Sequence, residues 1–160
     1  MGTENFLDVD SLKFGNPGNT FYLYVPFSGM ALSSESLVTE GIRISVQSMF
    51  VPEQSSANNN CYVFAYRISI SNESDHTVKL MRRHWIITDA YGEKRIVEGD
   101  GVVGQQPVLL PGQAHTYVSG SVFKTPIGKM EGFYTMQKDG SEIIDVVIPT
   151  FYLMAPSTLN

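Results

Sequence analysis

The chain has 160 residues, which suits one domain and leaves little room for two. Its 16 acidic and 11 basic residues give a formal net charge of −5, which argues against a general nucleic-acid binder because phosphate contacts need a basic face. Hydrophobic residues make up 42% of the sequence and charged residues 17%, so the chain is expected to fold rather than to stay disordered.

The sequence contains a single cysteine, Cys61. One cysteine excludes a disulfide framework within the chain and a zinc site with several cysteine ligands. The first ten residues, MGTENFLDVD, lack the basic flank and apolar run of a secretory signal, and no apolar run is long enough for a membrane helix. We therefore expect a soluble intracellular protein, cytoplasmic by default, that does not associate with membranes.

Residues 1–41 lack the repeated strand pattern of the rest of the chain. They hold one run of strand-forming residues, 21–25, after the turn-rich sequence FGNPGNT. We interpret them as an N-terminal arm whose strand covers an exposed sheet edge. Two versions remain open: the strand adds to its own sheet, or it adds to a neighbouring chain and forms a homodimer.

From residue 42 to residue 156, short runs of β-branched and aromatic residues recur, each ended by Gly, Pro, Asn or Asp. Alternation of side chains in residues 42–46 and 62–70 predicts two-faced strands. Further strands are predicted over residues 78–89, 93–97, 107–110, 114–122, 130–137 and 143–154. The Asp139-Gly140 pair between the last two runs is a strong hairpin signal.

This succession of strands predicts an all-β fold. About seven strands with almost no helical periodicity match an immunoglobulin-like or fibronectin-III-like sandwich of two antiparallel sheets. A barrel built from the same strands fits less well, although sequence separates the two architectures poorly. The predicted organisation is an arm over residues 1–41, a sandwich domain over 42–156 and a C-terminal tail over 157–160.

The run over residues 78–89 carries the first candidate site. Alternation divides it into two sets of side chains, one with Met81, Arg83, Trp85 and Ile87 and the other with Leu80, Arg82, His84 and Ile86. Trp85 is expected to point into the core.

Basic residues are concentrated around this run. Residues 79–95 hold five basic and two acidic residues, a local charge of +3 that leaves −8 for the rest of the chain. Arg83 and His84 on a sheet surface could receive a carboxylate or phosphate group. An alternative remains open, in which His84 is a solvent-facing strand residue and the arginines pair with acids on neighbouring strands.

Residues 99–104 (GDGVVG) fit the pattern G-x-G-x-x-G, which in dinucleotide-binding folds opens a helix whose N-terminus receives a pyrophosphate. The context opposes that interpretation, because Pro107 and Pro111 leave no room for a helix and the acidic Glu98 and Asp100 would repel a phosphate. We expect the glycines to permit positive φ angles and close backbone approach in a connection between the two sheets.

Patterns typical of catalysis or metal binding do not stand out. His76, His84 and His115 are scattered without the spacing of metal ligands. Cys61 lies at the start of an apolar strand, where a buried inert thiol is usual, and no G-x-S-x-G motif is present. We expect no enzyme, no metal site and no cofactor.

Seven blocks of the sequence resemble the ApaG family in order and spacing: residues 66–72 (YRISISN), 83–89 (RHWIITD), 98–107 (EGDGVVGQQP), 110–112 (LPG), 117–120 (YVSG), 125–132 (TPIGKMEG) and 148–151 (IPTF). The resemblance covers about residues 42–156 and does not extend to residues 1–41. It implies a fibronectin-III-like β-sandwich, no established catalytic activity, and protein–protein contacts like those of this domain in F-box proteins and a polymerase-delta-interacting protein. It further implies a genetic link to cobalt resistance and magnesium efflux, and a glycine motif at Gly99, Gly101 and Gly104 for which pyrophosphate binding has been suggested.

Residue patterns and resemblance together predict a non-catalytic module that binds another protein and does not bind nucleic acid directly. The candidate site residues are Arg82, Arg83, His84, Gly99, Gly101 and Gly104. The first alternative is binding of a phosphate-bearing small ligand or a divalent ion near the glycine loop, connected with cobalt and magnesium homeostasis. The second, hydrolysis of dinucleoside polyphosphates, would need a metal-held water that these residues do not visibly supply.

Overall fold

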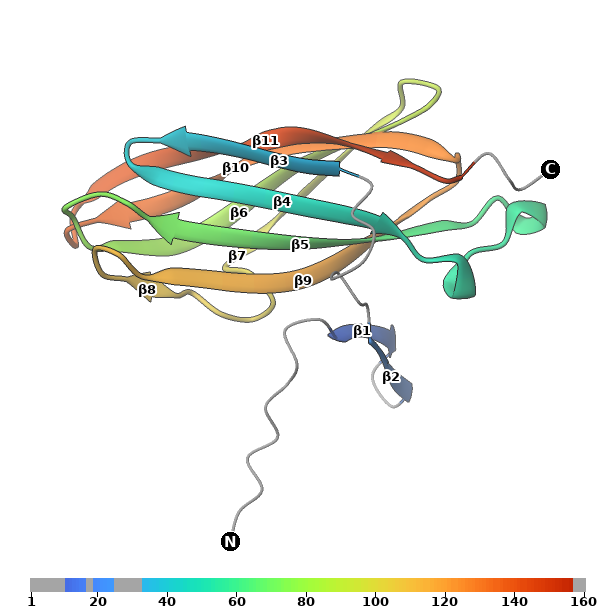
Figure 1. The fold of residues 1–160 in the computed structure, drawn as a ribbon, viewed down its shortest axis with the longest axis horizontal. Helices are drawn as coiled ribbons and strands as arrows, with labels where there is room; N and C mark the ends of the chain where they lie inside the picture. The colour runs from blue at the N-terminus through green and yellow to red at the C-terminus, as the bar shows by residue number, and fades with distance from the viewer. Residues whose placement is uncertain (1–10, 17–18, 25–32, 157–160) are drawn as a thin grey trace, which may run out of the picture.

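Two stacked antiparallel sheets form the body of the computed structural model, which describes residues 11–16, 19–24 and 33–156 (Figure 1). The strands of the first sheet are β6 (Val78–Asp89), β7 (Lys94–Asp100), β8 (Val108–Leu109), β10 (Ile127–Lys138) and β11 (Glu142–Met154). Those of the second are β3 (Ser33–Thr39), β4 (Ile42–Phe50), β5 (Tyr62–Asn72) and β9 (Ala114–Phe123). The first sheet has the order β11-β10-β6-β7, with β8 also paired to β6, and the second has the order β3-β4-β5-β9. The all-β sandwich of two antiparallel sheets predicted from the sequence is thereby confirmed, whereas its likeness to fibronectin domains stays a prediction.

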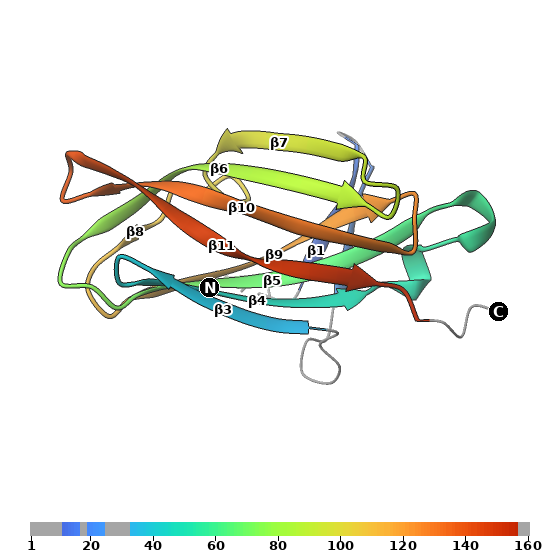
Figure 2. The ribbon, with the colours of Figure 1, turned by 90° about the horizontal axis from the view of Figure 1, so that it is seen from above.

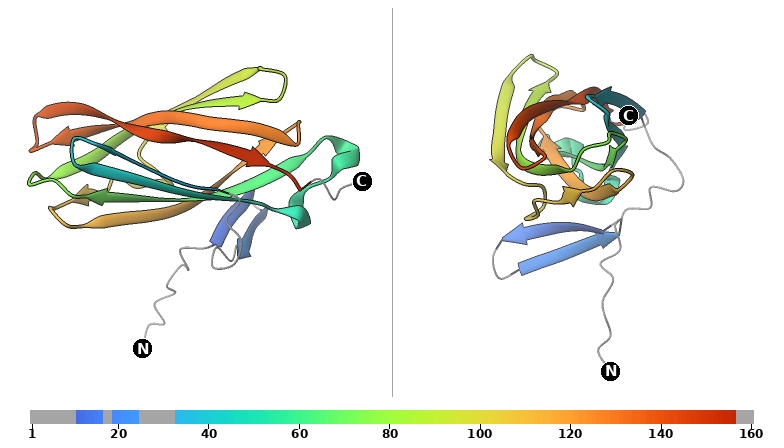
Figure 3. Two further views of the ribbon diagram at one scale, coloured as in Figure 1. Left: turned by 45° about the horizontal axis from the view of Figure 1, so that its top comes forward. Right: turned by 90° about the vertical axis from the view of Figure 1, so that its left-hand side faces the viewer.

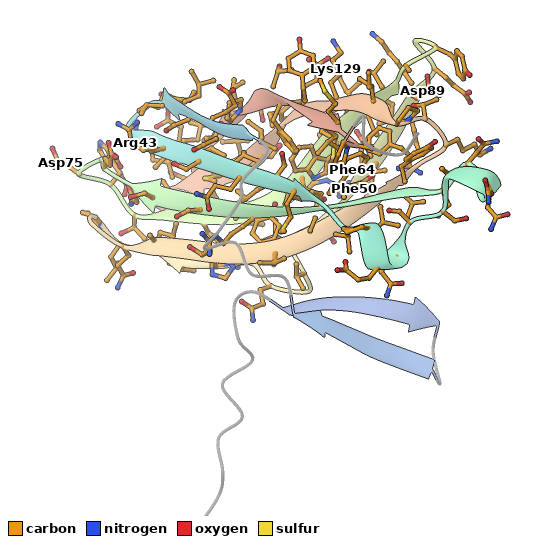
Figure 4. All side chains as sticks on the ribbon, turned by 45° about the vertical axis from the view of Figure 1, so that its right-hand side comes forward. Arg43, Phe50, Phe64, Asp75, Asp89 and Lys129 are labelled. Atoms are coloured by element: carbon orange, nitrogen blue, oxygen red, sulfur yellow. The ribbon has the colours of Figure 1, made fainter. Side chains whose placement is uncertain are left out.

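Alternating apolar side chains fill the space between the sheets. In β4 every second residue from Ile42 to Phe50 is buried, and Trp85 in β6 is only 3% exposed, which confirms its predicted place in the core. Phe50 and Phe64 contribute from the second sheet, with ring centroids 5.5 Å apart (Figure 4). Each buried side chain of this size stabilises the fold by about 1.5–3 kcal/mol relative to an exposed one, so this alternation holds the two layers together.

The N-terminal part of the chain is arranged differently from the prediction. Ser33–Thr39, which the sequence interpretation left in the arm, forms β3 and pairs along β4, so the sandwich begins before residue 42. The sequence does not show the alternation of apolar and polar residues that predicts a strand here, because this edge strand is solvated on both faces. β3 is polar at its start, and Leu37 and Val38 are both exposed.

A second correction concerns the strand expected over residues 21–25. Asn19–Tyr24 forms β2, which pairs with β1 (Ser11–Asn16) in a two-stranded sheet of its own and with no strand of the sandwich. This hairpin lies beside β9 (Figure 1). Residue 25 and the predicted tail, residues 157–160, lie outside the described residues.

Side chains of β6 change their phase once, at Met81. Leu80 lies opposite Met136 of β10 and Arg82 lies opposite Thr135, so Met81 has no partner in that ladder. The extra residue is a β-bulge, which puts Leu80 on the same buried face as Trp85. The sequence interpretation, which assigned Leu80 to the opposite phase from Trp85, was wrong at this point.

The sandwich is closed along one side and open along the other. β3 and β11 lie against each other, and the amide of Val147 donates a hydrogen bond to the hydroxyl oxygen of Thr39 over 3.3 Å. On the opposite side the edge strands are β7 and β9, and Figures 2 and 3 show β7 at the outer edge of its sheet. The interior of the sandwich is therefore accessible between β7 and β9.

Acid is expected to weaken the fold through His115 on β9. Burial lowers the pKa of its imidazole below the ordinary value of 6.5. A folded state that takes up a proton less readily than the unfolded chain is most stable above pH 6.5 and loses that stability as the pH falls through the lowered pKa. The loss is expected to be below about 1 kcal/mol, since the side chain is half-buried and solvent screens its charge. Urea unfolding on both sides of pH 6.5 measures it, and a His115→Gln variant with an unchanged pH slope would contradict it.

Candidate functional site

Pairing of β6 with β7 brings the predicted site residues together. In this ladder Arg82 lies opposite Asp100, Arg83 opposite Gly99 and His84 opposite Glu98. β7 extends to Asp100, past the predicted end at residue 97, because residues 98–100 continue the ladder along residues 82–84. Gly101 and Gly104 follow directly in the loop, so all six candidates lie in one region.

Arg82 and His84 are occupied by neighbouring acids. Arg82 Nη1 donates to Asp100 Oδ1 over 3.0 Å, and His84 Nδ1 shares a hydrogen bond with the Glu98 carboxylate. The His84 ring also stacks on Phe133 at a centroid distance of 4.7 Å. For Arg82 the geometry matches the alternative interpretation, in which the arginines pair with acids on neighbouring strands. His84, which that interpretation left facing solvent, is instead paired with Glu98 and partly covered by Phe133.

Arg83 instead lies on the inner side of β6, in phase with Trp85. Its Nη1 donates to the main-chain carbonyl oxygens of Asp100 and Gly101, each over 2.9 Å. Gly99 makes room for this arrangement, because a Cβ at that position would lie 2.9 Å from both terminal guanidinium nitrogens. Gly99, the first glycine of the motif, therefore leaves space for the side chain of an arginine on the neighbouring strand.

The remaining glycines shape a tight turn. Gly101 has a φ of +61°, and its amide donates to the carbonyl oxygen of Met81 over 2.9 Å. Val102 and Gln105 then exchange two main-chain hydrogen bonds of 2.8 and 3.0 Å, and Gly104 has a φ of +75°. The loop follows β7 as a closed turn and does not open a helix, unlike the dinucleotide-binding motif that its spacing resembles.

A cleft of about 600 Å³ opens between the sheets beneath this turn. Its lining residues come mainly from β6, β7, β9 and the glycine loop: Tyr66, Arg83, Trp85, Ile87, Arg95, Val97, Val102, Val103, Tyr117, Val118, Ser119, Gly120, Ser121, Val122 and Met130. Two arginines and no carboxylate are among them. A second hollow of about 320 Å³ continues past Arg95, and there Asp89 and Glu93 do contribute to the lining.

Arg95 links the two sheets across the open side. It lies opposite Ile87 in the ladder and so shares the inner face of β7, and its Nη2 donates to the hydroxyl oxygen of Ser121 on β9 over 3.2 Å. Among the described residues, neither Arg83 nor Arg95 forms an ion pair, in contrast to Arg82. The cleft therefore holds two guanidinium groups that form no ion pair with a described carboxylate.

Both guanidinium groups act on the phenol of Tyr66. Burial raises the pKa of Tyr66 above 10, while a hydrogen bond with Ser119 and the positive charges of Arg83 and Arg95 work in the opposite direction. Tyr66 lies opposite Ser119 in the β5–β9 ladder. The two arginines, the phenol and the serine hydroxyl thus converge on one part of the cleft.

The sequence interpretation missed Arg95, Tyr66, Ser119 and Ser121. The phase that Arg83 shares with Trp85 was a usable signal for one arginine. The position of Arg95 depends on the register of β7 against β6, and the serines enter through a strand of the other sheet. Local alternation does not report such long-range placement.

Other site types find little support within the described chain. Residues 11–16, 19–24 and 33–156 contain no group of three His, Cys, Asp or Glu side chains placed to hold a metal ion. None of the helices in these ranges is long and apolar enough to cross a membrane.

Comparison with known proteins agrees with the sequence resemblance. A model of the ApaG domain family matches residues 52–138. Protein ApaG of Paramagnetospirillum magneticum is 46% identical over 121 residues, which cover 76% of this chain and 93% of that protein. Protein ApaG of an Anaeromyxobacter species is 47% identical over 123 residues, covering 77% and 97%.

A solved structure shares the fold as well. The crystal structure described as an ApaA protein from Bordetella pertussis superimposes with a TM-score of 0.70 at 42% identity, covering 72% of this chain and 94% of that one. Because the family model spans more than half of the chain and the relatives match over almost their whole length, this chain belongs to the ApaG family.

Proposed function

We propose that this chain is a non-catalytic binding module that recognises an extended segment of a partner protein by strand addition to β7. The observation that carries the proposal is the open edge of the sandwich. By their ladders β3, β7, β9 and β11 are all edge strands, but β3 and β11 lie against each other and β1 lies beside β9, which leaves β7 with the least covered edge among the described strands. An open edge presents unpaired main-chain donors and acceptors to a partner.

The register identifies which main-chain groups are available. The amide of Asp89 donates to the carbonyl of Glu93, and the amide of Gly101 donates to that of Met81, so both pairs are hydrogen-bonded positions of the β6–β7 ladder. Alternation in an antiparallel ladder then directs the amides and carbonyls of Lys94, Ile96 and Glu98 away from β6. These residues form the edge that a partner strand would pair with.

The side chains of the cleft favour binding over catalysis. Its polar lining consists of arginine, tyrosine and serine, and it contains no histidine or carboxylate that would act as a general base near neutral pH. The charged residues along β7 discourage unspecific pairing, so a partner must match their pattern.

A second candidate is a phosphate-bearing small ligand held in the cleft. The arginine pair in a cavity of about 600 Å³ favours it, because cavities of this size accommodate metabolites. The described residues offer no comparable support for the divalent ion, since no three potential ligands converge.

Proline at position 96 tests the proposal. Linear peptides selected from a displayed random library against the full chain are expected to bind at least about tenfold more weakly to Ile96→Pro, because the substitution removes an outward amide from the pairing edge. Isothermal titration measures the affinities, and thermal unfolding verifies that the variant is folded.

Ile96→Ala is the matched control. It removes the same side chain but keeps the amide, so binding is expected to be retained. Equal losses in both variants would assign recognition to the side chain of Ile96, and peptides that ignore both substitutions would refute recognition at β7.

A further inference from the structure

We propose that the segment added to β7 carries an oxyanion side chain, either a carboxylate or a phosphate monoester, that enters the cleft between Arg83 and Arg95 beside an apolar side chain two residues away. This inference rests on the proposed function. It adds the chemical class of the partner segment to the place where that segment binds.

Strand geometry supplies the route into the cleft. Side chains of a strand point alternately to the two faces of its sheet. Every second side chain of a segment paired with β7 would therefore share the face of Arg95, Val97 and Gly99, which borders the cleft. The intervening side chains would face solvent.

The charge inside the cleft selects an anion. Arg83 and Arg95 form no ion pair with a described residue, and the cleft around them has no carboxylate lining. Arg82, on the opposite face of the same strand, already has Asp100. An incoming oxyanion would thus meet two guanidinium groups whose described hydrogen-bond acceptors are main-chain and hydroxyl oxygens and not carboxylates.

The donors are partly preorganised. Arg83 uses Nη1 to hold the carbonyl oxygens of Asp100 and Gly101, which fixes its guanidinium plane while the other guanidinium nitrogens are not used in these bonds. Arg95 makes a single bond to the neutral hydroxyl of Ser121, which it can exchange for a stronger bond to a charged acceptor. Tyr66 and Ser119 lie at the same place, and because they share a hydrogen bond, one of their two hydroxyl protons is left to donate.

Two further features indicate where the oxyanion and the apolar side chain of the partner segment lie within the cleft. Asp89 and Glu93 line the adjoining hollow past Arg95 and repel an anion there, so the oxyanion belongs toward Arg83 and Tyr66. Apolar walls from Val97, Val118 and Val122 leave room for a second, uncharged side chain. The expected recognition pattern is therefore an acidic residue, any residue, then an apolar residue, read in either direction along the segment.

The test uses the full chain and the peptides selected from the random library. Selected peptides are expected to share an acidic residue next but one to an apolar residue. Replacing that residue by glutamine, or the protein's Arg95 by glutamine, is expected to weaken binding about tenfold, whereas phosphoserine at the same place retains binding. Arg43→Gln removes the same charge from β4 in the other sheet, where the Arg43 side chain is 42% exposed, and is expected to leave the affinity unchanged.

The outcomes separate the two parts of the proposal, which are strand addition to β7 and recognition of an oxyanion side chain. Selected peptides that lose affinity for Ile96→Pro, yet share no acidic residue and bind Arg95→Gln with unchanged affinity, would overturn recognition of an oxyanion and leave strand addition standing. Equal losses in Arg43→Gln and Arg95→Gln would reduce the effect to overall charge and also overturn oxyanion recognition. Strand addition itself would be overturned if the library gave no binding peptides and sodium pyrophosphate alone bound in a way that depends on Arg95. That result would favour the small-ligand candidate.

Discussion

Replacing Gly101 by alanine is expected to lower the free energy of unfolding by about 3 kcal/mol or more. A Cβ at this position would lie 2.1 Å from the carbonyl oxygen of Gln105, and the φ of +61° is already unfavourable for alanine. That oxygen accepts the hydrogen bond from Val102 that closes the turn, so it cannot retreat without opening the loop. Urea unfolding followed by the fluorescence of Trp85, the single tryptophan, measures the loss.

Gly104→Ala separates the collision from backbone strain. Gly104 also has a positive φ, of +75°, but a Cβ there meets no atom within 4 Å. The expected loss is about 1 kcal/mol, the cost of the left-handed conformation alone. Losses of equal size at both positions would contradict the role assigned to the contact between residues 101 and 105.

Asn72→Ala is expected to cost about 2–4 kcal/mol of unfolding free energy. The side chain is fully buried at the end of β5. Its Nδ2 donates to the carbonyl oxygens of His76 and Leu109, over 2.7 and 3.0 Å, and its Oδ1 accepts from the amide and hydroxyl of Ser74. Alanine leaves these groups without their partner. It also removes the hydrogen bonds that connect the turn between β5 and β6 to Leu109, in the segment that leads into β9.

Asn58→Ala gives the matched comparison, because Asn58 is exposed in the short helix Ala57–Asn59. Its loss is expected to stay within about 0.5 kcal/mol. Denaturant unfolding of both variants provides the measurement. If Asn72→Ala were as mild as Asn58→Ala, the hydrogen bonds of Asn72 would not be holding the turn.

The sequence predicted the interior strands well and the edges poorly. β4 and β5 have one face in the core, so their alternation is visible without any knowledge of their neighbours. β3 is solvated on both faces and shows no alternation, which hid its membership of the sandwich. Met81 shifts the phase of β6 by one residue, and a bulge of this kind depends on how β10 pairs with β6.

The candidate site was predicted in its parts but not in its orientation. Arg82, Arg83 and His84 are adjacent in the sequence, yet the middle one faces the cleft and its neighbours lie on the outer face of the sheet. Arg95 joins Arg83 through the β6–β7 register, and Ser121 joins them from the other sheet. Such convergence follows from strand order, which no local pattern in one sequence specifies.

The spacing of the glycine motif has a mechanical explanation in this fold. Gly99 leaves space for the Arg83 guanidinium, and Gly101 allows the close approach of the Gln105 carbonyl. Neither requirement involves a phosphate. The same spacing in a dinucleotide fold serves a helix N-terminus, so the motif acquires its meaning only from the elements that flank it.

The closed seam between β3 and β11 also limits how copies of the chain can associate. Fibrils grow by edge pairing only when each molecule offers two free edges, one for each neighbour. Among the described strands β3 and β11 cover each other and β1 lies beside β9, so β7 has the least covered edge; pairing of β7 with β7 uses that edge in both molecules and ends at a two-fold pair. The uneven cover of its edges thus favours closed pairs over open-ended polymerisation, while the least covered edge stays available for recognition.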